Sequence, residues 1–197
     1  NVRGYQQEIS MTSVDASELH YMGERHPFIA LVGQFSRMSP DDRKQVIGQA
    51  ATPASLVKQN HFRPGRWNSY TVIARRNNIA QYLNGFKTSE LLDNYTGRNR
   101  RGAIALQLHS GMAMRVEFRN IRLKKLKKKY GRARRLFNAN DLEGWKAHPA
   151  KSRRAWKVED ARLVHVDKAG GYLRTKDTFE DFVLRFQWRH LSRGSAG

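Results

Sequence analysis

The sequence predicts an all-β domain, a sandwich or barrel of short strands. Three observations support this prediction: apolar and polar residues alternate in many short stretches, turn residues separate those stretches, and helical patterns are rare. A length of 197 residues suits one domain with a core of its own. Cysteine is absent, which excludes disulfides and thiolate metal sites, and no apolar run approaches the ~18 residues of a membrane-spanning helix.

The clearest strands form a hairpin in the first half of the chain. Residues 70–74 and 79–83 are separated by the turn residues 75–78. Asn84-Gly85 predicts a second tight turn, because glycine readily adopts the positive φ angle of such turns. Further strands are predicted at 104–108, 116–123, 155–158, 162–166, 171–174 and 182–188.

The strand at 116–123 contains an irregularity. Val116 and Phe118 alternate with polar residues, and the pattern resumes at Ile121 and Leu123 after a slip of one residue. This slip predicts a β-bulge near Asn120.

A single short helix is predicted over residues 52–58. Thr52 is a favourable N-cap residue, and Pro53 suits the first helical position. The four tryptophans are expected in the core rather than as sugar-stacking platforms: Trp67, Trp145, Trp156 and Trp188.

The charge is strongly positive and unevenly distributed. The chain has 37 Lys and Arg against 17 Asp and Glu, a net charge of +20, and residues 59–135 carry 19 of the basic and 3 of the acidic side chains. Such an excess fits either a solvated linker or strand end, or a contact with nucleic acid or another polyanion. The candidate contact residues form one run: Lys124, Lys125, Lys127, Lys128, Lys129, Arg132, Arg134 and Arg135.

The familiar local motifs of enzymes, such as a phosphate-binding glycine loop, an HExxH pair or a nucleophile elbow, are absent. Candidate chemistry comes instead from polar residues on strands. Gln107 and His109 leave the same face of a strand whose other face is leucine-rich, which suits sugar binding, general-base catalysis or metal ligation, but equally an ordinary exposed sheet face. Glu8 and Glu24 are candidate acid–base groups or metal ligands, although single surface carboxylates are more common.

Several segments resemble the 3-keto-disaccharide hydrolase-like domain family. They are Trp67-Asn68-Ser69-Tyr70, residues 79–85, 102–111 and 116–123, and Gly4-Tyr5-Gln6 near the start. The resemblance implies a concanavalin-like jelly-roll sandwich of two antiparallel sheets with one short helix.

The order of these segments differs from that of the family. Residues 2–126 resemble the family's C-terminal portion and residues 136–197 its N-terminal portion, with a basic linker at 127–135 between them. A circular permutant of a single domain, or a fragment of two tandem domains, would produce this order, and the permutant predicts that Asn1 and Gly197 are neighbours in space. The chain also departs from the family at Arg76 and Ala161, where the family prefers glycine.

The resemblance implies cleavage of 3-keto-glycosides or 3-keto-disaccharides. The C3 ketone acidifies the hydrogen on C2, so a base can remove it, the C1 substituent leaves, and water adds to the unsaturated sugar. The implied catalytic residues are His109, Glu24 and Glu8, and the implied substrate-binding residues are Gln107, Gln6, Tyr5 and Arg119. Either a divalent metal held by His109 and Glu8 or hydrogen-bond donors would stabilise the enolate oxygen, and no organic cofactor is implied.

Two other functions stay open at this stage: a non-catalytic carbohydrate-binding jelly roll, and a polyanion or nucleic-acid binder that uses the basic run. The expected partner is an oligosaccharide or glycoside, and nucleic acid is the alternative. The resemblance also implies a periplasmic or secreted protein without a membrane span.

Overall fold

The computed structural model describes residues 3–10, 18–23, 25, 28–108, 114–126, 132–167, 170–191 and 195–196. Most of these residues lie in β-strands, which confirms the predicted all-β jelly roll. The strands form a large sheet, a five-stranded sheet and a three-stranded sheet. None of the helices in this described part of the chain is long and apolar enough to cross a membrane.

The large sheet has ten strands. Their order is β14 (Trp156–Glu159), β15 (Arg162–Asp167), β11 (Met114–Lys125), β17 (Phe182–His190), β7 (Asn68–Arg75), β8 (Asn78–Leu83), β9 (Phe86–Asp93), β5 (Gln34–Met38) and β6 (Lys44–Gln49), with β12 (Arg134–Arg135) paired to β11. All neighbours are antiparallel except β5 and β9, which are parallel. The long connection between β5 and β9 through β6, α1, β7 and β8 permits this parallel pairing.

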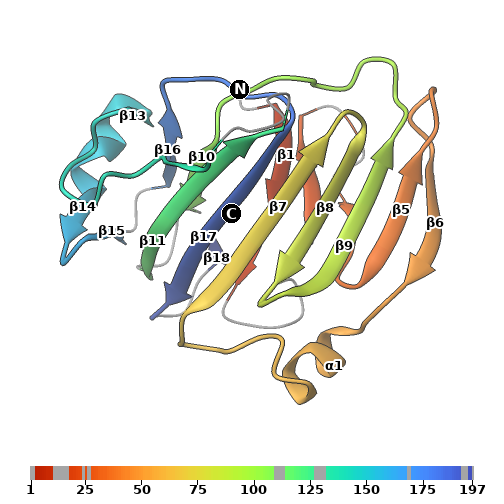
Figure 1. Cartoon of the computed structure of the whole chain (residues 1–197), viewed down its shortest axis with the longest axis horizontal. Coiled ribbons are helices and arrows are strands. Elements are labelled where there is room, and N and C mark those ends of the chain that lie inside the picture. Colours follow the sequence, from red (N-terminus) through yellow and green to blue (C-terminus); the bar gives the residue numbers. More distant parts are fainter. Residues whose placement is uncertain are drawn as a thin grey trace.

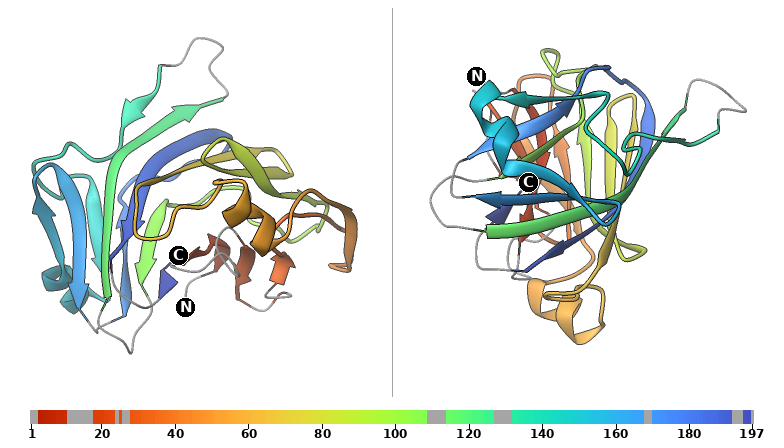
Figure 2. Two further views of the ribbon diagram at one scale, coloured as in Figure 1. Left: turned by 90° about the horizontal axis from the view of Figure 1, so that it is seen from below. Right: turned by 90° about the vertical axis from the view of Figure 1, so that its left-hand side faces the viewer.

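Two smaller sheets lie on one side of the large sheet (Figures 1 and 2). The five-stranded sheet has the order β13 (Trp145–His148), β16 (Gly171–Thr175), β10 (Ala105–Leu108), β18 (Ser195–Ala196) and β2 (Ile9–Ser10). The three-stranded sheet consists of β1 (Gly4–Gln7), β3 (Leu19–Met22) and β4 (Phe28–Ala30). Figure 2 shows the large sheet arching over both, so that only its inner face is covered.

Alternation along the strands fills two cores beneath the arch. In the main core Phe118 and Trp188 of the large sheet and Leu106 and Leu173 of the five-stranded sheet belong to one buried cluster. The second core is smaller and joins Leu19, Tyr21 and Ile29 of the three-stranded sheet to Met38 and Leu91 of β5 and β9. The burial of one side of each strand therefore attaches both small sheets to the large one.

The local sequence predictions are largely confirmed. Helix α1 (Pro53–Lys58) has Thr52 as its N-cap, and a second short helix, the 3₁₀ helix η1 (Ala150–Ala155), precedes β14. The pairing of β11 with β17 shifts register between Arg119 and Arg122, and Asn120 has a φ of 55°, which is the expected bulge.

The core prediction is confirmed for Trp145, Trp156 and Trp188 and is wrong for Trp67. Asn68, the next residue, is buried and lies opposite Trp188, so the alternation points Trp67 to the outer face of the large sheet. There its ring lies under a guanidinium group, with the Cζ of Arg119 3.9 Å from the ring centroid.

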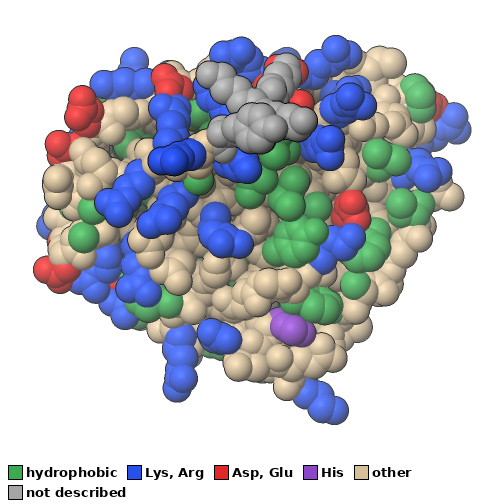
Figure 3. Space-filling model, in the orientation of Figure 1, with side chains coloured by type: hydrophobic (Ala, Val, Ile, Leu, Met, Phe, Trp, Pro, Cys, Tyr) green, Lys and Arg blue, Asp and Glu red, His purple; other side chains and the backbone are tan. Residues whose placement is uncertain are grey.

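The outer face of the large sheet is rich in Lys and Arg side chains (Figure 3). Glu117 is a buried acid on this face and is only 1% exposed. Its carboxylate accepts hydrogen bonds from Arg189 Nε at 2.7 Å and Arg115 Nε at 3.0 Å, and Arg162 approaches to 3.6 Å. Burial by itself raises the pKa of Glu117, but these arginines outweigh it and hold the pKa below its usual range.

At two turns, residues that depart from the glycine-containing pattern of the resembled family have positive φ angles. Arg76, with a φ of 56°, is the first of two turn residues between β7 and β8, a position where type II′ turns favour glycine. Asp160 and Ala161, with φ of 47° and 60°, link β14 to β15, and both angles are positive as in a type I′ turn. A side chain at such an angle is strained where glycine is not.

We expect Ala161→Gly to raise the free energy of unfolding by about 0.5–1 kcal/mol, because glycine removes the strain of the left-handed angle. Denaturant unfolding measures the change. Ala105→Gly, at an exposed strand position, is the matched control and should lower stability by about 0.5–1 kcal/mol. Equal losses in the two variants would contradict the strain at residue 161.

A second prediction concerns Glu117. Since its folded pKa lies below the unfolded value of about 4.3, the ion pairs stabilise the protein above that pH and are lost as the pH falls through the folded pKa. Glu117→Gln should therefore cost about 2–3 kcal/mol at pH 7, because its arginines keep partial solvent contact, and the cost should shrink below about pH 4. Unfolding of both proteins across this range tests it, with the exposed Glu143→Gln as control; a difference independent of pH contradicts it.

Candidate functional site

Four polar side chains share one face of the β1–β3 pair. Gln6 of β1 lies directly opposite His20 of β3, and the backbone N–H of Glu8 donates to the carbonyl of Glu18 at 3.0 Å. Residues two apart on a strand leave the same face, so Gln6, Glu8, Glu18 and His20 form a two-by-two array. We call this set the Glu8 cluster.

The four side chains are connected in two polar pairs. Gln6 Nε2 donates to Glu8 Oε2 at 3.0 Å, and His20 Nε2 lies 2.9 Å from Glu18 Oε2. Glu8 is 5% exposed and Gln6 9%, whereas the side chain of His20 is 20% exposed. The cluster thus has a buried end at Glu8 and a more accessible end at His20.

One acceptor in the Glu8 cluster is unused. The Oε1 atom of Gln6 is buried and has no hydrogen-bond partner among the described residues. A buried acceptor without a donor costs about 1–3 kcal/mol. A hydroxyl group of a bound ligand would satisfy it.

The five-stranded sheet brings the predicted residue Gln107 to the same side of the molecule. Ile9 and Leu106 point into the main core, so their neighbours Glu8 and Gln107 point away from it. Strand β18 lies between β2 and β10, pairing with Ile9 on one side and Leu108 on the other. Gln107 is partly buried and lies opposite Tyr172. The structure therefore places Gln6, Glu8 and Gln107 on the side of the small sheets that faces away from the core.

Two predicted catalytic residues, His109 and Glu24, lie outside the described residues, and their roles stay predictions. His109 directly follows Leu108, the last residue of β10. The described residues contain no group of three or more His, Asp or Glu side chains that could hold a metal ion.

The predicted substrate-binding residue Tyr5 does not join the Glu8 cluster. It points to the opposite face of β1, where its hydroxyl donates to Asp93 and its ring packs edge-on against Tyr21 at 5.3 Å. Burial raises the pKa of Tyr5 far above its usual range, and the bond to Asp93 adds to the shift. The hydroxyl is therefore a fixed donor rather than a titrating group.

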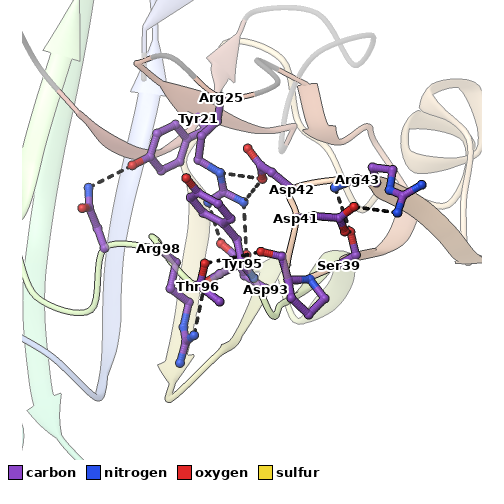
Figure 4. A network of polar contacts seen from close by, with 12 residues as sticks. Tyr21, Arg25, Ser39, Asp41, Asp42, Arg43, Asp93, Tyr95, Thr96 and Arg98 are labelled. Atoms are coloured by element: carbon purple, nitrogen blue, oxygen red, sulfur yellow. Dashed lines mark hydrogen bonds and ion pairs between the residues drawn. The ribbon is translucent and has the colours of Figure 1, made fainter.

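Asp93 belongs to a polar network beneath β5 and β9 (Figure 4). Arg25 bridges Asp93 and Asp42, with N···O distances of 2.7 and 2.6 Å. The rings of Tyr21 and Tyr95 lie 4.7 and 4.6 Å from its guanidinium carbon. Burial alone lowers the pKa of Arg25, but the two carboxylates outweigh it and raise the pKa, so the buried cation stays charged.

The predicted substrate-binding residue Arg119 is also apart from the Glu8 cluster. It lies on the outer face of the large sheet, where its Nε donates to Gln187 Oε1 at 2.9 Å. Tyr70 reaches Glu8 from the opposite, inner face, donating its hydroxyl to the Glu8 carbonyl at 3.1 Å. The large sheet thus separates the Arg119 side chain from Glu8.

The basic run is partly described. Lys124 and Lys125 end β11, Arg132 is exposed, and Arg134–Arg135 pair back onto β11 as β12. Arg134 lines a surface cavity of about 590 Å³ and is paired with Asp177 at 2.6 Å. Lys127, Lys128 and Lys129 lie outside the described residues.

Sequence reasoning missed Glu18 and His20. The available signal was the spacing Glu18-x-His20, which repeats the polar i, i+2 spacing of Gln6-x-Glu8. The pairing of the two segments was not visible, because strand register depends on which face meets the core.

A comparison with protein families supplies one match. The family described as the 3-keto-alpha-glucoside-1,2-lyase-like domain matches residues 2–124 and 132–197. No curated protein matches the chain. The prediction that Asn1 and Gly197 are neighbours concerns residues outside the described ones, and the permuted order stays a prediction.

The Tyr5 hydroxyl gives a testable prediction. Tyr5→Phe should lower the free energy of unfolding by about 1.5–3 kcal/mol, because it removes a hydrogen bond to a buried carboxylate. Tyr82→Phe, on the outer face of the large sheet, is the control and should leave the stability unchanged. Equal losses in the two variants would contradict the contribution of the Tyr5–Asp93 hydrogen bond.

Proposed function

Because the chain belongs to the 3-keto-alpha-glucoside-1,2-lyase-like domain family, we propose that it cleaves 3-keto-glycosides at the Glu8 cluster. The observation that carries the proposal is the buried Glu8 carboxylate held by Gln6, whose amide oxygen has no hydrogen-bond partner in the part of the chain that the structure describes. A base and a sugar-hydroxyl acceptor are thereby fixed side by side.

In the proposed reaction the C3 ketone makes the hydrogen on C2 acidic. A carboxylate base removes this proton, the electron pair forms the C1–C2 double bond, and the C1 substituent departs with the glycosidic oxygen. Water then adds its oxygen to C1 and a proton to C2, which restores a free 3-keto sugar. This elimination needs one base close to the hydrogen on C2. It does not need the pair of carboxylates with which most glycosidases act through an oxocarbenium-ion-like transition state.

Glu8 suits the role of this base. The Gln6 amide donates to one of its oxygens and thereby fixes the orientation of the carboxylate. Gln6 Oε1 would accept a hydrogen bond from a sugar hydroxyl, and Gln107 would bind a further part of the ligand from the same side. The Glu18–His20 pair, at the more exposed end, suits proton exchange with the leaving group or water.

The proposal keeps His109 and Glu24 as candidate base or metal ligands that adjoin the described residues. A divalent metal, if bound, would supply charge stabilisation for the enolate oxygen. No step above depends on it, because the described residues alone do not make a metal site.

The test is aglycone release from a chromogenic 3-keto-glucoside, compared with the unoxidised glucoside. We expect release from the keto substrate only. Glu8→Gln, which keeps the shape and the hydrogen bond to Gln6, should lose at least about 100-fold in kcat. The exposed Glu143→Gln is the matched control and should retain full activity.

Undiminished release by a folded Glu8→Gln variant would remove Glu8 from the chemistry. Inhibition by a chelator, reversed by a divalent cation, would add a metal to the site. Absence of release by the wild-type protein, even with divalent cations supplied, would overturn the enzymatic proposal and favour a carbohydrate-binding module.

A further inference from the structure

Three arginines lie in one row across the outer face of the large sheet. Arg122 of β11 is directly opposite Arg135 of β12 on one side and Arg185 of β17 on the other. Residues directly opposite each other on neighbouring strands point to the same face. Ile121 and Leu123 are buried in the core, so Arg122 and its row point outward, and all three arginines are exposed.

Without a bound ligand, this row of arginines lowers the stability of the folded protein. Like charges directly opposite each other destabilise a sheet, and Arg122 has such a neighbour on both sides. The buried carboxylate of this face, Glu117, is occupied by Arg115, Arg162 and Arg189. Within the described ranges, no carboxylate forms an ion pair with any arginine of the row. The row therefore has the charge pattern of a surface that receives an anion.

Further groups extend the row. Lys124 is exposed two residues beyond Arg122 on β11. Neutral hydrogen-bonding side chains continue the surface on the other side, where Thr71 of β7 lies opposite Arg185 and its hydroxyl accepts from Arg185 Nε at 3.3 Å. Figure 3 looks onto this face and shows Lys and Arg side chains over much of it. The surface thus combines clustered cations with groups that can bond to hydroxyls.

We propose that this arginine row binds a sulfated polysaccharide. Guanidinium groups form paired hydrogen bonds with oxyanions, and they do so better than ammonium groups. Neighbouring strands are about 4.8 Å apart, so the three charges fall within about 10 Å. This density of positive charge matches a polysaccharide with more than one sulfate group per disaccharide unit better than a polysaccharide with a single carboxylate per unit. The neutral Thr71 side of the surface suits the hydroxyl groups of the sugar.

Trp67, the tryptophan of this face, is not available as a stacking platform for a single-stranded nucleic acid. Proteins that bind single-stranded nucleic acids stack the bases on exposed aromatic rings. The Trp67 ring lies under the guanidinium groups of Arg119 and Arg189, at 3.9 and 4.8 Å from its centroid. Its face is already occupied and offers little area to a base.

The proposal does not depend on the chemistry proposed for the Glu8 cluster. The arginine row lies on the outer face of the large sheet, and the small sheets that carry Glu8 lie beneath the arch (Figure 2). Either proposal can fail while the other stands.

The test measures binding of a defined heparin oligosaccharide by calorimetry at several salt concentrations. We expect wild-type binding to weaken with rising salt, as for any contact that releases counterions. The double variant Arg122→Gln/Arg185→Gln should bind at least about 10-fold more weakly at physiological salt and with a shallower salt dependence. It should keep its 3-keto-glucoside activity and melt at the same or a slightly higher temperature, because a repulsive pair is removed.

The matched control is Lys151→Gln/Arg154→Gln, which removes the same charge from exposed positions on η1. It should bind heparin like the wild type, and so should Glu8→Gln. The proposal is overturned by absence of wild-type binding, by an equal loss in the control variant, or by equal affinity for desulfated heparin. Tighter binding of a single-stranded oligonucleotide of equal charge would assign the surface to nucleic acid instead.

Discussion

The alternation of side chains along residues 5–9 is the constraint on which the candidate site depends. Tyr5 is fixed in the second core by Asp93, and Ile9 is fixed in the main core. Gln6 and Glu8 must therefore point the other way, because successive side chains leave opposite faces of a strand. A slip of one residue would bury the amide and the carboxylate in the apolar cores and expose the anchors. The geometry of the polar cluster is thus set by apolar contacts made on the other side of the strand.

The sequence predicts the parts of this fold that depend on local pattern. The strand boundaries, the bulge at Asn120 and the cap at Thr52 all follow from a few neighbouring residues, and the structure has them close to where they are expected. Trp67 was misplaced because an aromatic residue before a strand carries no signal for which face it joins. The direction becomes clear only once Asn68 is known to pack inward.

The candidate site was less accessible to sequence reasoning than the fold. Glu8 is a candidate from the residues themselves and Gln6 from the resemblance, whereas Glu18 and His20 enter the cluster through the pairing of β1 with β3, which the alternation does not specify. For Arg119, by contrast, the local pattern already indicates the position. It follows the buried Phe118, so the alternation alone places it on the outer face, away from the strands that carry Glu8.

Strand β18 has a consequence for the order in which the protein assembles. Its two residues are the link between β2 and β10, and they connect Ile9 with Ala196 across nearly the whole chain. Contacts so distant in sequence close large loops, which slows folding. During synthesis residues 195–196 emerge after every other described residue, so the link between β2 and β10 beside Glu8 forms only once the rest of the described chain has been synthesised.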